Sequence, residues 1–210
     1  MPTKEAGATP MIERRFITAR ELHLETRAEG DTPPRIVGHA AIFDTLYPIG
    51  PEEDPWFLEQ VARGAFQQTI QEDDIRALFN HDDNFVLGRN TASTLLLAED
   101  DVGLRIEVVP DMESGRVRDV VRAIQRKDIT QMSIGMTVRA QAWEIRDDGV
   151  EVRTIQRVKL WDVSPVTFPA SRSTEVSVRS AFPPAELRAA SGPDAATLRR
   201  MHDLRVLDMM

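Results

Sequence analysis

Three side chains, far apart along the chain, are of the types that nucleophilic acyl transfer needs. His81 directly follows the apolar stretch Ile75 to Asn80, so we expect its imidazole at the end of a strand, near the surface. Ser133 is a lone hydroxyl in an apolar run, and Asp162 interrupts the mostly apolar stretch Val158 to Phe168, where an unpaired carboxylate costs free energy. A serine hydroxyl is a weak nucleophile, so it needs a base that takes its proton and a third group that fixes the tautomer of that base.

Each of the three also has an ordinary structural explanation, and the residue types alone leave both readings open. A serine in a strand commonly bonds only to the backbone. His81 with Asp82 and Asp83 would suit a solvated turn, and Asp162 could pair with an arginine on a neighbouring strand. Rival serines in or near a predicted loop are Ser164, Ser171 and Ser173.

Signatures of other chemistries are missing. The chain has no GxxxxGK[ST], GxGxxG, HExxH, SxxK or GxSxG pattern, so phosphate-binding, zinc-protease and nucleophile-elbow sites lack their usual marks. A metal-dependent hydrolase and a serine–lysine dyad are weaker alternatives, and we expect neither a metal nor a cofactor. Their candidate residues are His39, His81, Asp82 and Asp83 for the metal, and Lys127 and Lys159 for the dyad.

The composition is that of one compact domain with flanking arms. The chain has 210 residues, of which 41% are hydrophobic and 29% charged. A formal net charge of -8, from 26 basic and 34 acidic residues, argues against direct binding of nucleic acid. The lack of cysteine excludes disulfides and a cysteine nucleophile. No signal peptide and no membrane span is predicted, so we expect a soluble, cytoplasmic protein without a membrane partner.

Hydrophobic periodicity predicts many short strands and few helices. Strands are expected over 14–26, 35–43, 75–80, 85–89, 94–97, 102–109, 132–145 and 150–168, with a loop over 47–55. Helices are expected over 63–71, 114–127 and 194–208. This pattern is typical of an α+β, mainly β fold, with a closed or partly open β-barrel surrounded by a few helices. We expect a flexible arm over 1–13, the folded domain over 14–180, and a linker with a helical tail over 181–210.

Five motifs, in order along the chain, resemble those of the prohead proteases of tailed bacteriophages, which share a fold with herpesvirus assemblin. The motifs are Gly38 to Phe43 (GHAAIF), Arg63 to Phe66 (RGAF), Ala77 to Asp82 (ALFNHD) with Leu87 to Arg89 (LGR), Gln131 to Met136 (QMSIGM), and Trp161 to Ala170 (WDVSPVTFPA). The resemblance covers about residues 35–172. It implies a serine endopeptidase with a herpesvirus-protease-like fold.

The resemblance also implies roles for single residues. The histidine of the family's N-H-D motif is the general base, hence His81, and the serine of its M-S-[IF]-G motif is the nucleophile, hence Ser133. In herpesvirus relatives the third member is a histidine, and Asp162 occupies its place in this chain. An aspartate is the more ordinary partner for orienting the base, so Asp162 is the expected third member. Rivals for that role are Asp82, Asp83 and Glu144. Expected oxyanion donors are the backbone N–H groups of Ala170 and Ser171, with Arg172 holding their loop or a bridging water.

The resemblance finally implies a place of action. The family cleaves the scaffold, or the scaffolding arm of the major capsid protein precursor, inside an immature capsid in the host cytoplasm, and then usually itself. Herpesvirus relatives are dimers, which implies self-association here. The chain beyond Ala170 would suit a docking tail or a self-cleavage target. The alternative is a non-catalytic capsid assembly or scaffolding module with the same fold.

Overall fold

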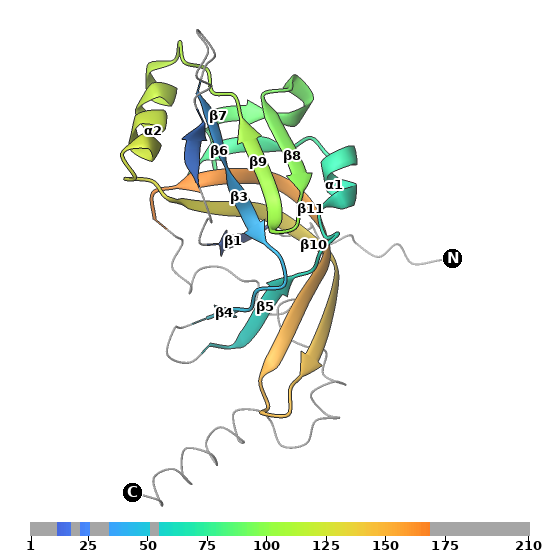
Figure 1. Ribbon diagram of the computed structural model, residues 1–210. Helices are drawn as coiled ribbons and strands as arrows, with labels where there is room; N and C mark the ends of the chain where they lie inside the picture. Colours follow the sequence, from blue (N-terminus) through green and yellow to red (C-terminus); the bar gives the residue numbers. More distant parts are fainter. Residues whose placement is uncertain (1–11, 18–21, 26–33, 51–54, 169–210) are drawn as a thin grey trace, which may run out of the picture.

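The computed structural model describes residues 12–17, 22–25, 34–50 and 55–168 (Figure 1). Within these ranges the chain is mainly β, with two α-helices and one short 3₁₀ helix. The strands are β1 (Glu13–Ile17), β2 (His23–Glu25), β3 (Arg35–Ile42), β4 (Tyr47–Ile49), β5 (Phe57–Val61), β6 (Arg76–Phe79), β7 (Asp82–Arg89), β8 (Leu95–Glu99), β9 (Gly103–Val108), β10 (Gln131–Ile145) and β11 (Glu151–Val166). The helices are α1 (Gln67–Glu72), η1 (Asn90–Ala92) and α2 (Gly115–Gln125).

The strands form two sheets. The larger sheet has the order β1-β10-β11-β5-β4, and β6 and β7 join it through β11; the smaller sheet has the order β2-β3-β9-β8. A bridge between Phe43 and Val61 links the two sheets at one point. In the part of the chain that the structure describes, no strand pairing closes them into a barrel. The mainly β, α+β class is therefore confirmed, whereas the closed form of the expected barrel is not found.

The β10–β11 hairpin is the longest element and carries much of the site. Its turn is closed by a hydrogen bond of 2.8 Å from the Gly149 N–H to the Arg146 carbonyl, with Gly149 at a φ of 79°, which a glycine adopts without steric cost. Figure 1 shows the hairpin passing β3 and β9 and extending beyond them at this turn. β5 and β6 both pair with β11 in parallel, at 152–155 and 162–163 respectively.

The core lies between the sheets and is covered by α2. It includes Ile36 of β3, Ile106 of β9, Ile134 of β10 and Leu160 of β11, all fully buried. α2 contributes a buried stripe at the expected helical spacing, made up of Val117, Val120, Val121 and Ile124. Burial of each such side chain stabilises the fold by about 1.5–3 kcal/mol. Among the described residues no helix is both long and apolar enough to span a membrane.

Two sequence predictions differ from the structure, and a third cannot be compared with it. The single strand expected over 14–26 is two strands in different sheets, because β1 pairs with β10 and β2 pairs with β3. The loop expected over 47–55 contains β4, and the unpredicted β5 lies beside it. β5 escaped notice because its sequence, FLEQV, places two polar residues within five. The helix expected over 194–208 lies outside the described residues.

Candidate active site

The pairing of β10 with β11 brings two of the three candidate residues onto one face. Ser133 lies opposite Ser164, and Gly135 lies opposite Asp162. Residues opposite each other in an antiparallel pair share a face, as do residues two apart along a strand. The side chains of Ser133, Asp162 and Ser164 therefore project together, with the bare Gly135 among them.

His81 reaches this face from the turn between β6 and β7. β6 runs parallel to β11 from Asp162 onward, so the turn at its carboxyl end lies beside Pro165, and the His81 side chain reaches Asp162 from there. Asn80 and His81 have left-handed backbone conformations, with φ of 54° and 56°, which are uncommon outside glycine and tolerated best by asparagine. The turn is held to β11, since the Asn80 amide donates to Thr167 Oγ1 at 3.1 Å and its oxygen accepts from the Thr167 N–H at 2.8 Å.

A continuous chain of hydrogen bonds joins the three side chains. His81 Nδ1 lies 2.6 Å from Asp162 Oδ1, and His81 Nε2 lies 2.6 Å from Ser133 Oγ. A carboxylate only accepts hydrogen bonds, so Nδ1 carries the ring hydrogen and Nε2 is free to accept the hydroxyl hydrogen. This is the tautomer in which imidazole can act as a base toward serine.

The carboxylate of Asp162 is buried, and its Oδ1 atom takes part in two hydrogen bonds. Besides His81, it accepts a hydrogen bond of 2.6 Å from the hydroxyl of Ser164. The alternative in which Asp162 pairs with an arginine on a neighbouring strand is not found, because Arg76 on β6 contacts Asp74 instead. The carboxylate also lies close against Gly135, since a Cβ at Gly135 would lie 2.1 Å from Asp162 Oδ2.

The rival residues lie elsewhere. Asp82 accepts hydrogen bonds from its neighbour Asn84, and the hydrogen bond from the Asn84 backbone is the first cause that lowers its pKa. Asp83 and Glu144 are exposed. His39 contacts Asp100 at 2.8 Å, away from His81. Within the described ranges no group of three or more His, Cys, Asp or Glu residues could hold a metal ion.

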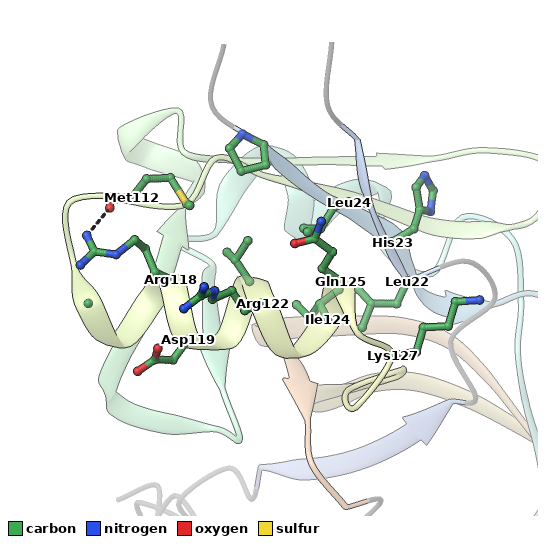
Figure 2. A pocket seen from close by; sticks show the side chains of 13 residues that line it. Leu22, His23, Leu24, Met112, Arg118, Asp119, Arg122, Ile124, Gln125 and Lys127 are labelled. Carbon is green, nitrogen blue, oxygen red and sulfur yellow. Dashed lines mark hydrogen bonds between the residues drawn. The ribbon is translucent and has the colours of Figure 1, made fainter. Parts of the chain in front are cut away.

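The expected oxyanion residues, Ala170, Ser171 and Arg172, lie outside the described residues. A cavity of about 830 Å³ lies between α2 and β2 (Figure 2). None of the three candidate residues lines it. The hydroxyl of Ser133 has no comparable opening, since this residue is completely buried, with β1 alongside.

Sequence reasoning missed three supports of this arrangement. The hydroxyl of Ser164 bonds to Asp162, the amide of Asn80 anchors the turn that carries His81, and Gly135 leaves room for the carboxylate. The spacing of Asp162 and Ser164, two apart on one strand, was a usable signal because such residues share a face. The other two depend on pairings between distant segments, which spacing does not reveal.

A hydroxyl, an imidazole and a carboxylate in continuous contact, carried by a mainly β fold, define the serine hydrolase class of site. The sequence matches the family described as Caudovirus prohead serine protease over residues 22–184, and the chain belongs to that family. The family expected from the five motifs is thus confirmed, and it is a family of serine peptidases of capsid maturation. No curated protein and no solved structure matches the chain.

Proposed function

We propose that this chain is a serine endopeptidase in which Ser133 is the nucleophile, His81 the general base and Asp162 the residue that orients His81. Ser133 Oγ attacks a peptide carbonyl while its hydrogen passes to His81 Nε2. The imidazolium, stabilised by Asp162, then protonates the leaving amine. Water hydrolyses the acyl-enzyme by the reverse use of the same base.

One observation carries this proposal: the two contacts of 2.6 Å that His81 makes, through different ring nitrogens, with Ser133 and Asp162. Each contact has the length of a direct hydrogen bond, so the hydroxyl and the base need no rearrangement to exchange a proton. An ordinary strand serine would be satisfied by the backbone alone and would not require an imidazole with an oriented tautomer.

The oxyanion site belongs to the same proposal. The backbone N–H groups of Ala170 and Ser171 would stabilise the negative charge that develops on the attacked carbonyl oxygen, and Arg172 would hold their segment. They follow the end of β11 at Val166 by four to six residues along the chain.

The family implies association with capsid precursor proteins. Within that setting, we assign as substrates the scaffold or the scaffolding arm of the major capsid protein precursor, followed by the chain itself. The enzyme would act after packaging into the prohead in the host cytoplasm, as a homodimer or higher assembly. Residues 14–180 would form the protease domain, and 181–210 would dock it or be removed by self-cleavage.

Co-expression with the capsid precursor tests the proposal. The wild-type chain, Ser133→Ala and a control, Ser114→Ala, would each be expressed with the precursor, and every fragment would be weighed by mass spectrometry. Ser114 is a matched control because its side chain makes no cap hydrogen bond at the start of α2. We expect precursor cleavage by the wild-type chain and by Ser114→Ala, and uncut precursor with Ser133→Ala. Normal maturation with Ser133→Ala would instead favour the non-catalytic assembly module.

A further inference from the structure

The nucleophile is covered by a strand of the same chain. Ser133 is 0% exposed, and β1 pairs with β10 so that Phe16 lies opposite Ser133 in the register. Ser133 Oγ lies 3.1 Å from the carbonyl oxygen of Arg15. The hydroxyl donates this hydrogen bond to the carbonyl oxygen, so the Arg15 peptide group lies directly beside the nucleophile, and a rotation of that group would present its carbon for attack.

β1 also occupies the place in which a substrate would bind. It is the edge strand of the larger sheet, and it pairs with β10 over 132–136, the segment that contains Ser133. An extended peptide commonly binds by adding a strand to such an edge. The edge of β10 beside Ser133 can accept either β1 or an incoming peptide strand, so the two compete.

Two side chains of β1, those of Glu13 and Arg15, lie in a buried cluster of charged residues. Glu13 and Arg15, two apart and on one face, are buried, whereas Arg14 between them is exposed. The Arg15 guanidinium bonds to both oxygens of Glu59, with Nε at 2.5 Å and Nη2 at 3.2 Å. Arg153 Nη1 bonds to Glu13 Oε2 at 3.0 Å and to Glu59 Oε2 at 2.8 Å.

Two charged residues of this cluster belong to other strands. Glu59 is on β5 and Arg153 on β11, and Tyr47 of β4 donates to Glu59 Oε1 at 2.6 Å. Burial raises the pKa of Glu59, but the Arg15 and Arg153 guanidinium groups bring it below its ordinary value. Glu59 therefore remains a buried carboxylate that suits an arginine, and Arg153 a buried cation that suits a glutamate.

We infer that β1 is bound as a substrate-like segment and that Glu59 and Arg153 determine specificity. They select an arginine immediately before the cleaved bond and a glutamate two residues earlier. The residue between the two is unrestricted, because its counterpart Arg14 faces outward. This inference rests on the proposed function, since it needs Ser133 to be the nucleophile. It makes peptides of the form Glu-X-Arg the substrate class, and the Arg15–Phe16 bond a site of self-cleavage.

The self-cleavage step would proceed as follows. Ser133 Oγ bonds to the carbonyl carbon of Arg15 while its hydrogen moves to His81 Nε2. The bond from Arg15 to the Phe16 nitrogen breaks, and His81 returns the proton to that nitrogen as it leaves. Water then hydrolyses the ester between Arg15 and Ser133, which frees residues 1–15 with a terminal carboxylate and restores the hydroxyl.

The first test follows this cut in the full-length chain. Wild type, Ser133→Ala, Arg15→Ala and Arg14→Ala would be purified and incubated, with intact mass and the new N-terminus measured over time. We expect the wild-type chain to yield a product beginning at Phe16 and Ser133→Ala to yield none. Arg15→Ala should slow this cut at least about tenfold, the loss of one charge-assisted hydrogen bond or more. The exposed Arg14→Ala should stay within about twofold of wild type.

A second test needs no substitution and so stands even if Arg15→Ala misfolds. Two phosphonate esters that modify serine nucleophiles would carry the same residues in opposite order, with Glu-Ala-Arg in one and Arg-Ala-Glu in the other. We expect the Glu-Ala-Arg ester to modify Ser133 of the wild-type chain at least about tenfold faster.

The outcomes separate the inference from the proposed function. If cleavage depends on Ser133 but avoids the Arg15–Phe16 bond, and both esters react equally, the specificity inference is wrong while the protease stands. If no cleavage and no modification depends on Ser133, the proposed function fails and the inference falls with it.

Discussion

At the scale of single residues, the site depends on a glycine as much as on the three polar side chains. Asp162 Oδ2 lies so close to Gly135 that a Cβ atom at position 135 would be only 2.1 Å from it. The carboxylate is also buried and cannot retreat into solvent. A side chain at position 135 must therefore displace Asp162 and, through it, the ring of His81.

We predict that Gly135→Ala lowers peptidase activity by about 100-fold or more, because a shift of about 1 Å in a catalytic group has an effect of that size. Gly115→Ala is the matched control, since a Cβ there would meet nothing closer than Arg118 Nη2 at 3.7 Å. Hydrolysis rates and thermal unfolding of both variants would be compared with wild type. Unchanged activity in Gly135→Ala would show that the position of Asp162 does not matter for turnover.

The sequence was enough to predict which residues could form the site, but not how they are buried. Ser133, His81 and Asp162 could be predicted as candidates because a motif or an unusual polar residue in an apolar stretch marks each of them. The burial of Ser133 under β1 was not, because the contact between Ser133 and Arg15 spans 118 positions in the chain. Local periodicity carries no information on such a distant pairing.

At the scale of elements, the β8–β9 hairpin shows how a charged residue can fix a turn. Asp100 Oδ1 accepts hydrogen bonds from the N–H groups of Val102 and Gly103, at 2.8 and 2.9 Å, and its Oδ2 contacts His39 at 2.8 Å. Burial raises the pKa of Asp100, but the His39 hydrogen bond and the two backbone N–H groups outweigh it and lower the pKa to about 2.

This gives a prediction of pH dependence. Because the pKa of Asp100 in the folded chain lies below its ordinary value of 3.8, the ionised carboxylate stabilises the fold fully above about pH 4 and loses that effect as the pH falls toward 2. Asp100→Asn should therefore be less stable than wild type near pH 7, and the difference should shrink between pH 4 and pH 2. Denaturant unfolding at both ends of this range measures it.

The exposed Asp147→Asn, in the β10–β11 turn, serves as the control for loss of a carboxylate. A stability difference for Asp100→Asn that stays constant from pH 7 to pH 2 would mean that the charge of Asp100 is not what stabilises the hairpin.

The β8–β9 hairpin was predictable from the sequence, because two apolar alternating runs flank a polar turn. The strands β4 and β5 were not, since pairing rather than composition makes them strands.

Along the chain as a whole, the family match includes the three site residues but leaves out both ends of the sequence. The match covers residues 22–184, so β1 lies before it and most of the proposed docking tail lies after it. The elements that hold Ser133, His81 and Asp162 lie within the matched range. Catalysis and delivery to the capsid are therefore proposed to reside in different parts of the chain.

Deletion of residues 185–210 tests this division. We predict that the shortened chain still cleaves a free peptide, because the triad lies well before the deletion, but is no longer incorporated into proheads. Peptide hydrolysis and the protein content of purified proheads would be measured side by side. If proheads still contain the shortened enzyme, the tail is not needed for docking.

The role of Ser133 as a nucleophile activated by His81 is tested most directly by mapping the residue that an irreversible fluorophosphonate modifies. An edge strand opens transiently, so modification accumulates even though β1 covers the site. Peptide mapping by mass spectrometry should find the phosphonyl group on Ser133 in the wild-type chain and little or none in His81→Ala, because the hydroxyl then lacks its base. Modification of another residue, or of Ser133 at the same rate in His81→Ala, would contradict the account.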